Sequence, residues 1–150
     1  MNSSKLKAMQ TIHLAFCVAI IVMAATSYLT VKDRLSIDTS LNQPEVFFPL
    51  FPILGIISLI AGQYLYKQQI SNLQDLSAED KINKYQVAFI IRAALFEFPS
   101  LLNTIGFLVS GNIIFLIASL IFFVFLLATR PKKQTIIDEL NLSYPDTEKL

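Results

Sequence analysis

Four long apolar stretches constrain the fold of this chain more than any other feature. They cover approximately residues 8–31, 46–66, 85–109 and 111–129. Each has about the 20 helical residues needed to cross a hydrocarbon layer of roughly 30 Å. Among the 12 basic and 11 acidic residues, only Arg92 and Glu97 fall inside these stretches. The sequence therefore predicts an all-α integral membrane bundle of four transmembrane helices.

The composition excludes several other classes of protein. Of the 150 residues, 54% are hydrophobic and 15% are charged, whereas soluble domains have about 45–50% apolar and about 25% charged residues. Intrinsically disordered proteins have low hydrophobicity, so this composition excludes that class. A net charge of +1 does not supply the basic surplus that nucleic-acid binding requires, and one cysteine excludes a disulfide scaffold. Membrane lipid is the expected surrounding, and nucleic acid is not an expected partner.

Turn and cap residues divide the chain. The apolar run from Tyr85 to Thr129 is too long for one crossing, and residues 110–112, Ser-Gly-Asn, supply a turn near its middle. Ser77 is a candidate helix N-cap with Asp80 three residues later. Since the second helix can also continue past Tyr66, we expect spans two and three to form one long helical hairpin.

The basic residues near the helix ends predict the orientation. One side of the predicted topology collects eight of them: Lys5, Lys7, Lys67, Lys81, Lys84, Arg130, Lys132 and Lys133. The other side has Lys32 and Arg34, in a loop that reads as an ordinary external connection. Both termini are therefore expected in the cytoplasm, with the protein in a bacterial inner membrane. An alternative reading of the first span is a signal peptide cleaved near residues 25–27, Ala-Thr-Ser.

Residues 1–130 are accordingly assigned to the transmembrane domain and residues 131–150 to a cytoplasmic tail. The tail contains a short, partly amphipathic segment with Ile136, Ile137, Leu140 and Leu142, preceded by Lys132 and Lys133. Such a segment can lie at the headgroup surface or dock on a partner. A solvated tail is the alternative.

Small residues are expected to mark helix contacts, because helices in lipid associate by close packing and hydrogen bonds. Gly55, Ser58 and Gly62 share one face of span two, and Ala15 with Ala19 do the same on span one. Pro99 lies inside span three, where it is expected to kink the helix and to free the carbonyl group of residue 95.

Two charged residues lie within span three. Glu97 is expected roughly 18 Å deep, near the midplane, and Arg92 roughly 10 Å deep. An ionised carboxylate there is costly, so Glu97 is a candidate for proton binding, with Arg92 tuning its affinity. His13 and Gln63 lie at the level of Arg92, and Ser58 and Ser119 lie nearer Glu97. If their faces converge, these residues form a polar track from the cytoplasm. In the structural alternative, Arg92 snorkels, His13 sits in the interface and Glu97 is a neutral hydrogen-bonding acid.

Two resemblances accompany this pattern. Residues 77–82, Ser-Ala-Glu-Asp-Lys-Ile, followed by residues 92–97, Arg-Ala-Ala-Leu-Phe-Glu, resemble the loop and second helix of rotary ATPase c-type proteolipids. The resemblance implies that Glu97 matches the proton-carrying carboxylate. That family's first helix is dense in glycine, whereas this whole chain has four, so the likeness is one of chemistry. The four spans and the tail are also similar to small uncharacterised four-span bacterial membrane proteins.

Catalytic motifs are absent from the sequence. One histidine and one cysteine, both in span one, do not make a usual metal site, and no phosphate-binding or dinucleotide motif occurs. No enzyme activity, metal or cofactor is expected. The leading hypothesis is a non-enzymatic accessory or scaffold subunit that contacts other membrane subunits or copies of itself. The alternative is a proton- or ion-linked carrier that uses Glu97.

Overall fold

The computed structural model describes residues 4–40, 49–73 and 75–150, and its elements there are helical. Five α-helices and two short 3-10 helices follow one another: α1 (Ser4–Val31), η1 (Lys32–Arg34), α2 (Leu50–Ser71), α3 (Ala78–Ser110), α4 (Ile113–Ala128), α5 (Lys133–Leu140) and η2 (Asp146–Lys149). The predicted second span begins at residue 46, and residues 46–48 lie outside the described part of the chain. As expected, α2 continues past Tyr66, to Ser71.

Three of the described helices, α1, α2 and α3, are long and apolar enough to cross a membrane. Helix α4 has 16 residues, which corresponds to about 24 Å. Helix α4 is long enough to cross a membrane only when α5 is counted with it, and the two helices are bent by 68° relative to each other. The described residues therefore contain three candidate spans, or four when this bent pair is counted as one.

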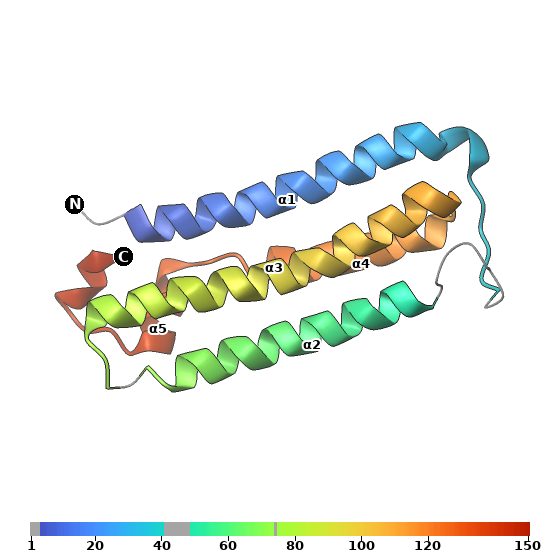
Figure 1. Ribbon diagram of the computed structural model, residues 1–150. Coiled ribbons are helices and arrows are strands. Elements are labelled where there is room, and N and C mark those ends of the chain that lie inside the picture. The colour runs from blue at the N-terminus through green and yellow to red at the C-terminus, as the bar shows by residue number, and fades with distance from the viewer. Residues whose placement is uncertain (1–3, 41–48, 74) are drawn as a thin grey trace.

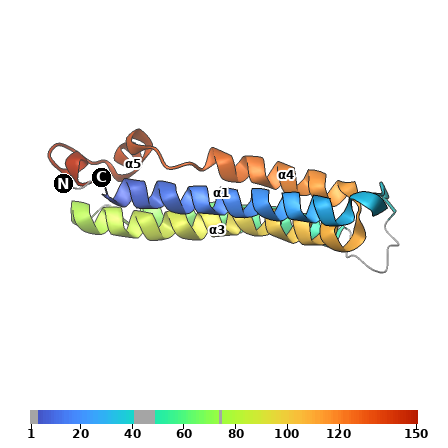
Figure 2. The ribbon, with the colours of Figure 1, turned by 90° about the horizontal axis from the view of Figure 1, so that it is seen from above.

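Helix α3 is the centre of the bundle. It packs against α1, α2 and α4, while α1 and α4 touch lightly, as do α2 and α4. Helices α2 and α3 run in opposite directions as the predicted hairpin (Figure 1). Seen from above, α4 lies beside α1 over the part of the bundle nearer the α3–α4 turn (Figure 2). The two chain ends and α5 gather at the end of the bundle where α3 begins.

The helix ends follow the turn chemistry of the sequence. The Ser77 hydroxyl accepts the Asp80 N–H at 3.2 Å and caps α3. Gly111 ends α3 in the left-handed conformation, with φ of 71°, which costs glycine no steric penalty. The side-chain oxygen of Asn112 then accepts the N–H of Ile114 at 3.1 Å and caps α4.

The loop after α1 is fastened to the α3–α4 turn, which the reading as an ordinary external loop did not anticipate. The backbone N–H of Ser36 donates to the carbonyl of Gly111 at 3.0 Å. The Arg34 guanidinium donates to the carbonyl of Leu108 at 2.8 Å, and the Asn112 side chain donates to the carbonyl of Asp38 at 2.7 Å. These bonds hold the end of α1 against the last turn of α3.

The apolar side of the tail segment packs on the bundle itself, unlike the solvated tail of the alternative. Ile136 and Leu140 of α5 and the terminal Leu150 are buried in the same apolar cluster as Leu73 and Ile82 of the hairpin. This cluster closes the end of the bundle that carries both termini. A second, smaller cluster of Val31, Phe107 and Phe115 lies at the opposite end.

Candidate functional site

The small residues of α2 face α3. Gly55, Ser58 and Gly62 are all buried. A Cβ atom placed on Gly62 would lie 3.0 Å from the Cβ of Leu95, and one on Gly55 would overlap the Phe122 ring. These small residues therefore let α2 approach α3 and α4 closely. The stripe packs against helices of the same chain, within the bundle rather than as an exposed surface.

Pro99 lies inside α3, which continues through it as one helix. Proline has no N–H, so the carbonyl of Leu95, four residues earlier, loses its helical partner. The Ser58 hydroxyl donates to this carbonyl at 2.7 Å. One residue of the α2 stripe thus satisfies the polar group that the proline exposes.

Ala15 and Ala19 do not make the contacts of α1 within the bundle, because both are exposed. The face of α1 that packs inward consists instead of Met9, His13, Cys17 and Ile20 with further residues towards its end. Both faces of this helix are apolar, so the sequence does not mark which one is buried.

A hydroxyl network joins α3 and α4 in the interior. The Ser100 and Ser119 hydroxyls each donate to the backbone carbonyl of the other residue at 2.8 Å. The Thr104 hydroxyl lies 2.8 Å from that of Ser119. Asn103, also fully buried, donates to the carbonyl of Pro99 at 2.8 Å, and its side-chain oxygen has no partner among the described residues. Ser119 therefore acts as a helix–helix hydrogen bonder.

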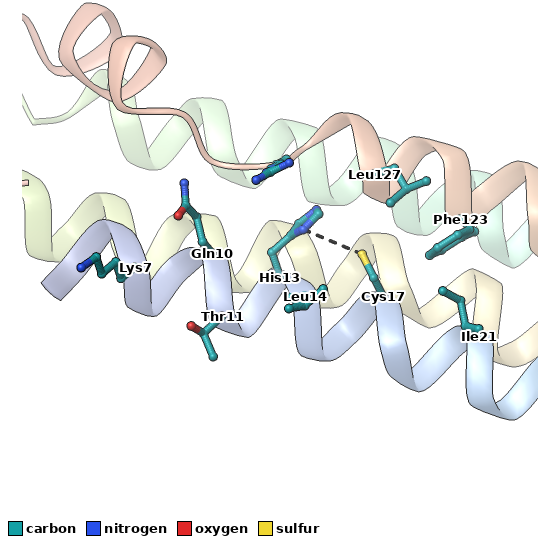
Figure 3. Close-up of a pocket in the computed structure, with 10 residues that line it drawn as sticks. Lys7, Gln10, Thr11, His13, Leu14, Cys17, Ile21, Phe123 and Leu127 are labelled. Carbon is teal, nitrogen blue, oxygen red and sulfur yellow. Dashed lines mark hydrogen bonds between the residues drawn. The ribbon is translucent and has the colours of Figure 1, made fainter. Parts of the chain in front are cut away.

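His13 joins α1 to α4. Its Nε2 donates to the carbonyl of Leu126 at 3.0 Å. In a neutral imidazole this leaves Nδ1 as an acceptor, and the Cys17 sulfur lies 3.8 Å from it (Figure 3). Both residues line a groove of about 610 Å³ between α1 and α4, with Lys7 and Arg130 among its other lining residues.

Arg92 lies on the other side of α4, in a groove of about 570 Å³ lined also by Gln63. Its guanidinium carbon stands 4.4 Å above the centre of the Tyr66 ring and 5.4 Å from that of Phe96. The Nε atom of Arg92 is buried and has no hydrogen-bond partner in the described part of the chain. A cation over aromatic faces is stabilised by the ring quadrupoles, but its charge is not neutralised by them.

Glu97 is half-buried in α3. Arg92 faces Tyr66 of α2, and no ion pair joins it to Glu97 within residues 4–40, 49–73 and 75–150. The predicted track residues are thus divided between separate surroundings. His13 lies in one groove and Gln63 with Arg92 in another, while Ser58 and Ser119 are bonded to backbone carbonyls.

A second polar cluster lies where the tail meets the hairpin. The Tyr66 hydroxyl donates to the Glu139 carboxylate at 2.5 Å and shares a hydrogen bond of 2.9 Å with the Tyr85 hydroxyl. Both tyrosines are buried. The sequence reasoning missed this cluster, because its residues come from three separate helices and no local spacing relates them.

Within the residues that the structure places, no three His, Cys, Asp or Glu side chains lie close enough together to hold a metal ion. Among the described residues, two grooves flank α4, and buried tyrosines fasten the tail to the hairpin. Glu97, within α3, makes no hydrogen bond with any residue that the structure describes. Comparisons with protein-family models, curated proteins and solved structures find no match to this chain.

Proposed function

We propose that the protein is a four-helix, multi-pass membrane protein of the bacterial inner membrane, and that it works as a non-enzymatic accessory or scaffold subunit through helix–helix contacts. The apolar lengths of α1, α2 and α3 support insertion in a bilayer. Helix α4, flanked by Asn112 and Arg130, is the fourth span of this proposal, and its length of about 24 Å is accommodated by local thinning of the bilayer or by snorkelling of flanking residues.

The proposed topology places both termini in the cytoplasm. The two chain ends lie at one end of the bundle (Figure 1), the end to which eight basic flanking residues belong. Basic residues near span ends favour the cytoplasmic side. The opposite end, with Lys32 and Arg34, faces outwards in this proposal.

A stripe of small and β-branched residues on the exposed face of α1 carries the scaffold proposal. The α1 stripe consists of Thr11, Ala15, Ala19, Val22, Thr26 and Thr30, all exposed. Their spacings of four, four, three, four and four residues keep them on one side of a helix.

The hydroxyl groups of this stripe are already satisfied near its end. Thr26 donates to the carbonyl of Val22 at 2.9 Å, and Thr30 donates to the carbonyl of Thr26 at 2.8 Å. From Ala15 to Thr30 the stripe therefore presents short side chains whose hydroxyl groups are bonded to the backbone of α1. Small residues at such spacings let the backbones of two membrane helices approach closely. The partner that fits is a transmembrane helix of another subunit or α1 of a second copy.

Site-directed crosslinking tests this proposal. Cys17 is the one cysteine of the chain, so Cys17→Ser gives a cysteine-free background. Ala19→Cys then places a thiol on the α1 stripe, and Ile21→Cys places one on another exposed part of the same helix. We expect a photoactivatable crosslinker attached to the introduced thiol to join the Ala19→Cys protein to a partner or a second copy in native membranes, and to leave the Ile21→Cys protein uncrosslinked. Equal crosslinking of both variants, or recovery of an isolated monomer from mild detergent with no product from either, would overturn the proposal.

One observation favours the proton- or ion-linked carrier as a second candidate. Glu97 is half-buried in α3, and it makes no hydrogen bond or ion pair with any described residue. Its carboxylate is therefore not held by a structural bond. In this candidate function Glu97 binds and releases the proton by itself, since Arg92 faces another helix.

A further inference from the structure

The groove between α2 and α4 combines cationic and apolar walls. Its volume is about 570 Å³. Arg92, Lys67 and Gln63 contribute polar groups, and Leu59, Ile60 and Phe125 contribute apolar surface. No acidic side chain is among the residues that line it. The groove thus has a positively charged part, at Arg92 and Lys67, and an apolar part along the rest of its wall.

Arg92 has no acidic side chain as a counter-ion among the described residues that line this groove. Its guanidinium stacks on Tyr66 and Phe96, and its Nε is buried without a hydrogen-bond partner in the described residues. Glu139 reaches the same tyrosine but accepts its hydroxyl proton, and no ion pair joins Glu139 to Arg92 within the part of the chain that the structure describes. An arginine within a membrane segment is costly unless an anion or water compensates its charge. An anion at this position would remove that cost.

We propose that this groove binds one anionic phospholipid from the leaflet at the basic end of the bundle. Its phosphate lies between Arg92 and Lys67, where a guanidinium offers paired donors to phosphate oxygens. One acyl chain lies along Leu59, Ile60 and Phe125. The site rests on the proposed insertion in a bilayer, but it is independent of docking through the α1 stripe.

Three features favour a lipid over a free anion. The apolar wall would be left exposed by a small ion, whereas an acyl chain covers it. The groove lies between two spans that touch only lightly, so a chain can enter it from the side. Arg92 follows Tyr85, the predicted inner boundary of span three, by seven residues, or about 10 Å along the helix. Lys67 directly follows predicted span two. A headgroup held between them reaches inwards from the interface.

The other groove, between α1 and α4, lacks this combination. Its cations, Lys7 and Arg130, are both exposed, and neither is stacked or buried. Its one buried polar ring, His13, is already bonded to the carbonyl of Leu126. The need for an anion is therefore specific to the Arg92 groove.

Native mass spectrometry of the full-length protein in mild detergent tests the site. Phosphatidylglycerol, phosphatidylcholine and inorganic phosphate are added separately to the wild-type protein and to Arg92→Gln and Lys67→Gln variants. The matched control is the double variant Lys132→Gln, Lys133→Gln, which removes two exposed charges from the same end of the bundle. Thermal unfolding followed by circular dichroism establishes that each variant is folded.

We expect the wild-type protein to retain one phosphatidylglycerol in preference to phosphatidylcholine, and to retain no inorganic phosphate. Losing one charge-assisted contact should weaken phosphatidylglycerol binding by about tenfold in each groove variant and leave the control unchanged. If Arg92→Gln does not fold, the exposed Lys67 still provides the comparison. Equal binding of the two lipids, retention of phosphate alone, or an equal loss in the control variant would overturn the proposal. None of these outcomes depends on crosslinking of α1, so failure here is distinguishable from failure of the scaffold function.

Discussion

Replacing Ser58 with alanine should destabilise the bundle in a way that depends on Pro99. In the wild-type protein the Ser58 hydroxyl is the donor to the Leu95 carbonyl, at 2.7 Å. Alanine removes the donor and leaves the carbonyl unpaired in apolar surroundings. An unsatisfied buried polar group costs about 1–3 kcal/mol, while hydrogen bonds between membrane helices average about 0.6 kcal/mol and reach about 1.7 kcal/mol. Serine and alanine are close in size, so we expect a loss of about 1 kcal/mol, with little from packing.

Measuring the cost of Ser58→Ala in a Pro99→Ala protein tests whether this cost depends on the proline. Alanine restores the N–H that can bond the Leu95 carbonyl within α3. It also keeps a Cβ atom, which in the wild-type protein packs against Gly55. In this background the carbonyl keeps a partner when the Ser58 hydroxyl is removed. Ser58→Ala should then cost less than about 0.3 kcal/mol, giving a coupling energy of roughly 0.7 kcal/mol.

The assay is equilibrium unfolding in mixed micelles, with helix content followed by circular dichroism as the fraction of denaturing detergent rises. The four proteins needed are the wild type, each single variant and the double variant. A Ser58→Ala cost that is equal in the two backgrounds would refute the reasoning, because it would show that the hydroxyl stabilises the protein by something other than the carbonyl freed by proline. A cost near zero in the wild-type background would refute it as well.

Three further predictions concern other parts of the molecule. Glu97→Gln should leave the proton permeability of reconstituted vesicles unchanged, as measured with a pH-sensitive dye, whereas abolition of a wild-type proton flux would favour the carrier. Glu139→Gln should weaken the bond to Tyr66 by about 1 kcal/mol and accelerate hydrogen exchange in the tail, and unaltered exchange would show that the tail does not depend on this bond. Gly111→Ala should cost about 1–2 kcal/mol and lower the Tm, since φ is 71° and the new Cβ would meet the Arg34 carbonyl at 2.5 Å; an unchanged Tm would contradict this.

Local chemistry made the helix boundaries predictable. Ser77, Gly111 and Asn112 have the side chains, or the lack of one, that a helix end needs, and the structure uses each of them in that way. The carbonyl freed by Pro99 was likewise predictable, because the missing N–H follows from covalent structure. Its partner Ser58 was singled out for a different reason, as a small residue on the packing face.

Contacts between distant segments were not predictable in the same way. In lipid, buried and exposed faces are both apolar, so nothing in the composition of α1 distinguishes the inward Cys17 and Ile20 from the outward Ala15 and Ala19. The tail offered Ile136 and Leu140 four residues apart, which indicates one apolar side but not the surface that covers it. The five-residue spacing of Arg92 and Glu97 on one helix already made an ion pair between them difficult. That Arg92 instead faces Tyr66 of α2 could be known only from the packing of the helices.

The position of α3 at the centre has a consequence for biogenesis. Helix α1 is synthesised first, but the helix it chiefly packs against is α3, and the acceptor for His13 is the carbonyl of Leu126 near the end of α4. During translation His13 therefore lacks this acceptor until three more helices have left the ribosome. A chain truncated before α4 would lack both the His13 acceptor and the α3–α4 contacts, so the packing of the first helix is completed only by the last residues of the bundle to be made.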